Sequence, residues 1–207
     1  MSTLFETYDA LLAMGADSHH AARRAEMRRA FEARTGAFGP DDPWFEARSR
    51  AFWDDALTTQ GFAREAARAL AEELVPWGLA FGRAHRGLFE RFVDRAVAVP
   101  SGSVLLRDVY TGAELMVEID SAIADALRVA SGLMDARVVG HDGRVGMLSG
   151  VLFHQAEATP PIKGVIARAK ERGMEVGPAL DALMRMELRL RSLSRVKVAY
   201  AYRPEML

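Results

Sequence analysis

The sequence SVLLRDVYTGAELMVEID, residues 103–120, decides how this chain folds. Its first half, Val104 to Tyr110, is apolar around two charged residues, and its second half alternates polar and apolar residues from Glu114 to Ile119. Thr111-Gly112 lies between the halves and provides a tight connection, because glycine adopts the backbone conformations that short turns require. The pattern predicts a β-hairpin inside a chain that is otherwise patterned for helices.

The same change of pattern continues on both sides of the hairpin, over residues 92–156. Before it, Phe92 to Val99 alternates weakly and ends at the turn residues Pro100-Ser101-Gly102. After it, we expect a short helix from Ser121 to Val129 with Ser121 as its cap. A second hairpin follows, with strands at 133–139 and 145–153 around Asp142-Gly143. Short strands with closely spaced turns indicate a small antiparallel β-barrel or curled sheet.

Residues 1–91 have the periodicity and the start and stop signals of helices. Predicted helices cover residues 3–15, 19–34, 43–60, 64–75 and 79–91. Asp42-Pro43 is a strong start signal, because Asp accepts hydrogen bonds from free N–H groups and Pro has no N–H to leave unpaired. No repetitive linker separates this region from the β region, so we expect one compact unit.

Residues 157–207 are predicted to form a C-terminal helical hairpin, with helices at 162–172 and 179–193. The apolar residues of the second helix step by four, three, four and three positions, which is the spacing of a heptad seam. The seam consists of Ala179, Leu183, Met186, Leu190 and Leu193. The last run, Val196 to Tyr202, alternates and is compatible with an edge strand. The expected fold class is therefore α+β.

Composition narrows the class of protein. A chain of 207 residues can bury a sizeable core, and its net charge is −1. Cysteine is absent, which excludes disulfides and thiolate metal sites and fits a reducing compartment. The first 15 residues lack the basic leader of a signal peptide, and no run of 18 apolar residues exists to span a membrane. We expect a cytoplasmic protein without a membrane partner.

Residues 92–153 resemble an accessory β-domain of bacterial proteins whose tails often carry a SEC-C zinc-binding motif. The matching pieces are Leu105-Leu106-Arg107-Asp108, Thr111-Gly112, Ala136-Arg137-Val138-Val139 and Asp142-Gly143. The resemblance implies a β-domain without known catalytic residues. Because this chain has no cysteine, the zinc-binding tail and any metal-linked role are not carried over.

Residue types that carry catalysis or metal binding are present without the spacing that such chemistry needs. The histidines are His19, His20, His85, His141 and His154, and they do not pair at the spacing of metal ligands. The adjacent acids at 41–42, 54–55 and 72–73 diverge on a helix, whereas acid–base catalysis needs carboxylates that converge. Nucleotide-binding and serine-hydrolase motifs are absent. We therefore expect no enzyme, metal or cofactor.

Aromatic residues concentrate in the N-terminal region, as Phe38, Trp44, Phe45, Phe52, Trp53 and Phe62. Such residues at helical spacing pack in a core, or they line an exposed groove for a partner peptide or helix. Trp44, at a helix start, is the one we expect to be exposed. The predicted partner-binding residues are Trp44 and Trp53, with Leu183, Met186 and Leu190 of the heptad seam.

Charge is distributed unevenly along the chain. Residues 96–158 carry eight acidic and four basic side chains, and residues 159–207 carry five acidic and ten basic ones. The basic set of the last helix and its continuation is Arg185, Arg189, Arg191, Arg195 and Lys197. These residues form either a solvated helix face or a nucleic-acid-binding surface.

The leading hypothesis is a non-catalytic, cytoplasmic protein-interaction or regulatory role, with another protein or a second copy as partner. The alternative is a nucleic-acid-binding regulator that uses the basic C-terminal helix. A third hypothesis is an enzyme with a pocket between the helical part and the sheet, which would require charged residues that converge around a cavity.

Overall fold

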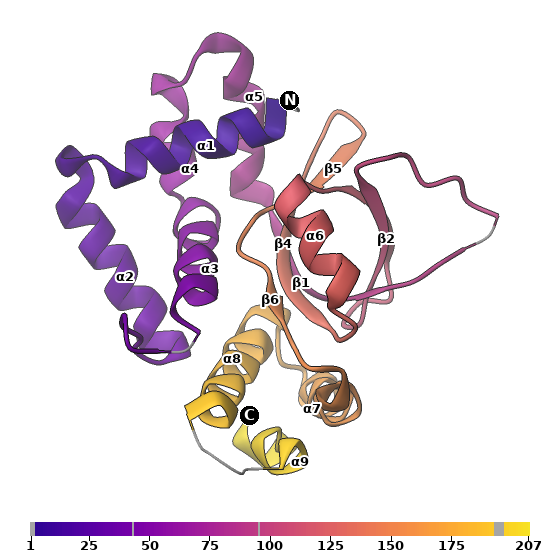
Figure 1. Ribbon diagram of the computed structural model, residues 1–207. Helices are drawn as coiled ribbons and strands as arrows, with labels where there is room; N and C mark the ends of the chain where they lie inside the picture. The colour runs from indigo at the N-terminus through magenta and orange to yellow at the C-terminus, as the bar shows by residue number, and fades with distance from the viewer. Residues whose placement is uncertain (1–2, 43, 95, 193–196) are drawn as a thin grey trace.

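The computed structural model describes residues 3–42, 44–94, 96–192 and 197–207. It is an α+β protein in which a β-barrel lies beside an N-terminal group of helices and above a C-terminal group (Figure 1). This confirms the predicted class and the order of helical, β and helical parts along the chain.

The N-terminal part consists of short helices around one apolar core. α3 ends at Leu57, and Gly61, in the left-handed conformation with φ of 78°, is the N-cap of the next helix. The single helix expected over 64–75 is wrong in detail, because short turns replace it and Pro76 begins α5 rather than ending a helix. The elements are α1 (Thr3–Ala16), η1 (Ser18–His20), α2 (Ala21–Thr35), α3 (Phe45–Leu57), α4 (Phe62–Ala66), η2 (Ala67–Ala69), η3 (Glu72–Leu74), α5 (Val75–Ala80) and η4 (Phe81–Arg83).

The β part is a closed five-stranded barrel with one further short strand. Its strands are β1 (His85–Arg91), β2 (Ser103–Asp108), β3 (Glu114–Glu118), β4 (Met134–His141), β5 (Arg144–Met147) and β6 (Leu152–Phe153). The order β1-β2-β3-β5-β4 closes because β1 also pairs with β4, and β6 lies beside β4 after β5 ends. All pairings are antiparallel except that of β3 with β5.

One end of the barrel is closed by α6 (Ser121–Val129), which connects β3 to β4 (Figure 1). Ile123 and Leu127 of this helix are buried in the barrel core with Phe89, Leu106 and Val117. The strand order and the helix between the third and fourth strands are similar to those of an OB-type barrel. The bounds of α6 confirm the predicted helix.

Both predicted hairpins are present. β2 and β3 pair from Ser103↔Glu118 to Arg107↔Glu114, and β4 and β5 pair up to His141↔Arg144. Asp142 and Gly143 connect β4 to β5 with φ values of 50° and 70°. Positive φ at both central residues is the signature of a type I′ turn, which Asp-Gly favours.

The start of the barrel differs from the prediction. Residues 85–91 form β1 instead of continuing a helix, and the described residues of the expected first strand, 92–94 and 96–99, form no strand. β1 is buried on both faces, because Leu88 contacts the C-terminal helices and Phe89 points into the barrel. A strand buried on both faces shows no polar–apolar alternation, so its sequence does not differ from that of a buried helix.

The C-terminal part packs its helices against the outer face of β1. Its elements are η5 (Ala156–Ala158), α7 (Thr159–Glu171), α8 (Val176–Ser192), α9 (Val198–Ala201) and η6 (Pro204–Met206). α7 and α8 form the predicted pair of helices within one apolar core. The expected final strand is wrong for its described residues, 197–202, which contain α9; Val196 lies outside the described residues. None of the described helices combines the length and apolar composition needed to cross a membrane.

Candidate functional site

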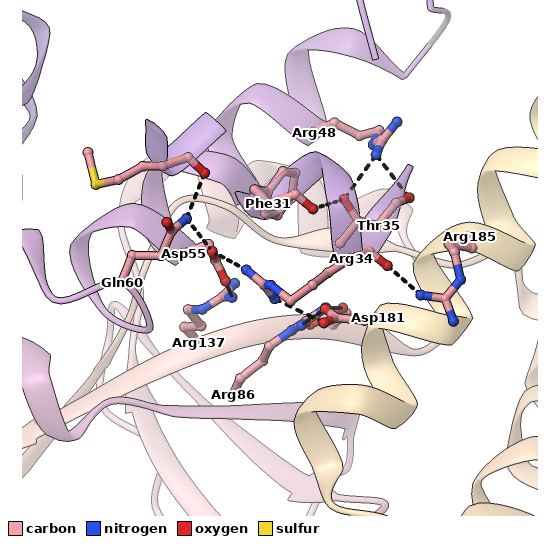
Figure 2. Close-up of polar contacts among 12 residues, drawn as sticks. Phe31, Arg34, Thr35, Arg48, Asp55, Gln60, Arg86, Arg137, Asp181 and Arg185 are labelled. Carbon is pink, nitrogen blue, oxygen red and sulfur yellow. Dashed lines mark hydrogen bonds and ion pairs between the residues drawn. The ribbon is translucent and has the colours of Figure 1, made fainter. Parts of the chain in front are cut away.

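Charged side chains converge where the three parts of the molecule meet (Figure 2). Arg34 of α2 donates to Asp55 of α3 at 2.5 Å and to Asp181 of α8 at 2.9 Å. Arg86 of β1 also contacts Asp181, with 2.6 Å between Nη1 and Oδ1. Arg137 of β4 donates to the second oxygen of Asp55 at 2.7 Å. We call this set, with Asp135, the junction network.

Every carboxylate of the junction network is paired, whereas Nε of Arg137 is buried without a hydrogen-bond partner among the described residues. Arg86 binds both oxygens of Asp135, at 3.0 and 2.7 Å, in the paired geometry that guanidinium and carboxylate groups favour. Burial alone would lower the pKa of Arg86, but Asp135 and Asp181 hold that pKa above its usual range. Three arginines face three aspartates, and each carboxylate is bound by at least one guanidinium. The network therefore joins the parts and leaves no carboxylate available for a substrate.

Arg48 of α3 forms hydrogen bonds with the C-terminal end of α2, close to the junction network. Its side chain is fully buried and donates to the carbonyl oxygens of Thr35, Gly36 and Ala37 at 3.2, 2.6 and 3.0 Å. The last carbonyls of a helix have no partner within the helix. Arg48 supplies a partner for the carbonyl of Thr35, the last residue of α2, and for the two carbonyls that follow the helix. Its guanidinium also lies 4.4 Å from the ring centroid of Phe38.

A groove of about 480 Å³ lies between the N-terminal helices and the barrel. Its walls are α1, α3, α6 and the segment after β5, and we call it the interdomain groove. Its apolar lining includes the half-buried rings of Trp53 and Phe153. The lining consists of Tyr8, Asp9, Leu12, Ala47, Arg50, Trp53, Asp120, Ala122, Ile123, Ala126, Ser149, Val151 and Phe153.

The buried carboxylate of Asp54 connects three elements that line the interdomain groove, namely α1, α3 and the segment after β5. Asp54 of α3 accepts hydrogen bonds from the Tyr8 hydroxyl at 2.6 Å and from the Gly150 N–H at 2.9 Å. Burial raises the pKa of Asp54 to about 6, although Tyr8, Arg137 and Gly150 oppose the shift. A Cβ at position 150 would lie 2.6 Å from Asp54, so glycine is required where the barrel segment approaches α3.

The structure separates the two tryptophans that the sequence predicts as partner-binding residues. Trp53 lines the interdomain groove and is half-buried. Trp44 is 6 % exposed, so the expectation that it is the exposed aromatic residue is wrong. It packs in the N-terminal core, where the guanidinium of Arg191 lies 4.6 Å from its ring centroid.

The heptad seam lies in the C-terminal core. Leu183 and Met186 are each 1 % exposed, and Leu190 packs against the same core. Leu193 lies outside the described residues. Ala179, Leu183 and Met186 are therefore covered by this chain's own residues, and Leu190 is half-buried.

The basic residues of α8 also contact other residues of this chain, although Arg185 and Arg189 are exposed. Arg185 donates to the carbonyl oxygen of Arg34, and Arg191 donates to Glu187 at 2.6 Å. Arg189 contacts the sulfur of Met206 at 3.8 Å. Lys197 is exposed at the start of α9, and Arg195 lies outside the described residues. Among the described residues of this set, Arg185, Arg189 and Lys197 are exposed, and Arg185 and Arg189 lie four residues apart on α8.

The β2–β3 face, through which OB-type barrels bind nucleic acid, has opposite charges in pairs. Arg107 binds Glu114 at 2.7 Å, and Arg144 binds Glu118 at 2.7 Å. β2 and β3 contain no aromatic side chain that could stack a base. β2 and β3 themselves therefore offer neither an excess of positive charge nor an aromatic ring for stacking, and the nearby ring of Phe92 lies 4.9 Å from the guanidinium of Arg107.

Sequence analysis missed the junction network and most of the residues that line the interdomain groove, although its third hypothesis placed a pocket between the helical part and the sheet. A usable signal was present, because Arg86, Asp135 and Arg137 interrupt apolar strand sequences where a buried charge needs a partner. Nothing in the sequence paired these strands with Arg34, Asp55 and Asp181. Among the described residues, no group of three acidic, histidine or cysteine side chains is placed to hold a metal ion.

Comparisons of the chain with protein-family models, with curated proteins and with solved structures find no match.

Proposed function

We propose that this chain is a cytoplasmic, non-catalytic protein-interaction module that binds a segment of a partner protein in the interdomain groove. The observation that carries the proposal is the groove itself, which two parts of the molecule build together around Trp53 and Phe153. Half-buried aromatic rings in a concave site are the usual anchors of protein interfaces. The absence of cysteine supports the proposed compartment.

The charge around the groove indicates the chemistry of the segment. Asp9 is exposed at the rim and forms no hydrogen bond or ion pair with any described residue. Asp120 is a second acidic residue of the lining, and the only basic residue there, Arg50, is 3.8 Å from Glu46. Residues 96–158 are acidic as well. A segment with a large apolar residue and a neighbouring Lys or Arg fits this surface.

An enzymatic role has less support in this groove. Asp54 is the buried carboxylate nearest to it, and its two oxygens are occupied by Tyr8 and Gly150. Asp120 accepts from the Ile123 N–H at 2.7 Å as a helix cap. Acid–base catalysis needs a carboxylate that can reach a substrate proton. The acids of the groove are therefore better explained as structural and recognition groups.

The alternative, a nucleic-acid-binding regulator, predicts retardation of nucleic acid at low salt that weakens when Arg185 and Arg189 are neutralised. The contacts of both side chains within the chain give this proposal less support. The resemblance of residues 92–153 to a SEC-C-associated accessory β-domain remains a proposal too, and it agrees with a binding role without catalysis.

Selection of displayed random peptides on the immobilised full chain tests the interaction module. We expect enrichment of peptides with a large apolar residue within two positions of Lys or Arg. Ala126→Gln places a long polar side chain in the groove and should remove this enrichment. Val129→Gln is the matched control, because Val129 is 86 % exposed on the same helix outside the groove. Equal enrichment on the wild type and on Ala126→Gln would contradict the proposal.

A further inference from the structure

A second cavity, of about 420 Å³, lies at the end of the barrel where β1, β3 and β5 begin and β2 and β4 end. α6 connects the end of β3 to the start of β4 and therefore lies at the other end of the barrel. Leu115 of β3, Val138 of β4 and Val145 of β5 form its apolar wall. Each of them is two residues from a residue of the barrel core, namely Val117, Ala136 and Met147. Side chains two apart in a strand share a face, so these residues face the interior of the barrel. The cavity is therefore the mouth of the barrel interior.

Polar groups gather at the rim of this mouth. His85 and Asp108 are the inward-facing residues at the start of β1 and the end of β2, and 2.9 Å separates His85 Nε2 from Asp108 Oδ2. Asp108 is buried, and it also accepts from the Tyr110 N–H and the Thr111 hydroxyl, each at 2.8 Å. Burial alone would raise the pKa of Asp108, but the hydrogen bonds from His85, Tyr110 and Thr111 hold it below its usual value.

An ionised Asp108 fixes the proton on Nε2 of His85. Nδ1 of the same ring forms no hydrogen bond with any described residue, and the His85 side chain is 41 % exposed. Arg83, the last residue of η4 and two residues before the start of β1, also lines the mouth and is exposed. Within the described residues, no carboxylate lies close enough to form an ion pair with Arg83. The rim therefore carries a paired His–Asp unit and one cation without a counter-ion.

We propose that the mouth of the barrel is a binding site for a small organic carboxylate with a short apolar body. The carboxylate would meet Arg83 and the exposed edge of His85, and the apolar body would enter between Leu115, Val138 and Val145. The cavity volume is within the range of small-molecule sites, and an apolar wall with a few convergent polar groups is typical of such sites. This site is separate from the interdomain groove and does not depend on the proposed interaction.

Titration of the full chain with phenylacetate and with phenylacetamide, followed by NMR signals of the His85 ring, tests this site. The two probes have the same body, and only the first is charged. We expect phenylacetate to bind at least tenfold more tightly than phenylacetamide. Arg83→Gln should remove this preference, whereas Arg107→Gln on the outer surface of the barrel should retain it.

A second variant tests the apolar part of the site. A Cβ at Gly140, which lines the mouth, would have no atom closer than 3.8 Å, so Gly140→Leu can fill the cavity without a backbone clash. We expect at least tenfold weaker binding of phenylacetate by Gly140→Leu and unchanged binding by Ala126→Gln. Failure of both probes to bind the wild type, equal affinity for the two, or an unchanged preference in Arg83→Gln would overturn the proposal.

Discussion

At the scale of single residues, Arg48 shows how one buried cation can fix a chain segment. It donates to three consecutive carbonyl oxygens, of Thr35, Gly36 and Ala37. A lysine has one ammonium group and cannot reproduce this fork, so carbonyls would remain unpaired. We expect Arg48→Lys to lower the free energy of unfolding by about 2–4 kcal/mol in urea denaturation. Arg50→Lys, in the same helix and exposed, should leave it unchanged.

The raised pKa of Asp54 makes the free energy of unfolding decrease as pH rises. Its folded pKa of about 6 is above the value of about 3.9 expected in the unfolded chain. The folded state therefore binds this proton more tightly, so the stabilisation is complete below pH 4 and is lost as pH rises through 6. The pKa difference corresponds to about 3 kcal/mol.

Asp54→Asn tests this effect, because an amide can still accept from Gly150 and donate to the oxygen of Tyr8. The difference in free energy of unfolding between wild type and variant should change by about 2 kcal/mol between pH 4 and pH 7, because the rest of the effect falls below pH 4. The pKa values of Asp108, Asp181 and Glu187 are lowered in the folded protein. The stability that these ionised carboxylates contribute is therefore lost only at more acidic pH. A difference that stays constant from pH 4 to 7 would show that Asp54 is not the titrating group.

At the scale of elements, α6 depends on a cap that sequence analysis placed one residue too late. Asp120, not Ser121, accepts from the Ile123 N–H, at 2.7 Å. We expect Asp120→Ala to destabilise the protein by about 1 kcal/mol, whereas Ser121→Ala has no measurable effect. Thermal unfolding of the two variants checks this. The reverse order of the two effects would make Ser121 the cap.

Elements with an exposed face were predictable, and elements buried on both faces were not. The β2–β3 hairpin, α6 and α8 follow from alternation, turn residues and helical periodicity. β1 could not be predicted from these patterns, because both Leu88 and Phe89 are buried and its sequence therefore does not alternate between polar and apolar residues. The interdomain groove was not predictable either, since its walls come from α1, α3, α6 and residues 149–153. Only tertiary packing brings these segments together.

At the scale of the whole molecule, the junction network makes the helical parts and the barrel one unit. Arg86 neutralises Asp135 and Asp181, so Arg86→Gln leaves buried carboxylates without this partner. We expect a loss of about 3–5 kcal/mol in the free energy of unfolding. The matched exposed variant, Arg107→Gln, should leave the midpoint of urea unfolding unchanged. Equal midpoints for both variants would contradict a stabilising role of the network.

The most direct test of the interdomain groove as a binding surface is calorimetric titration of one selected peptide, with an apolar residue beside Lys or Arg, into three proteins. The wild type and Val129→Gln should bind this peptide with equal affinity, because Val129 lies outside the groove. Ala126→Gln should bind it at least tenfold more weakly, a change of about 1.4 kcal/mol or more. Equal affinity for all three proteins would place the binding surface elsewhere and contradict the account.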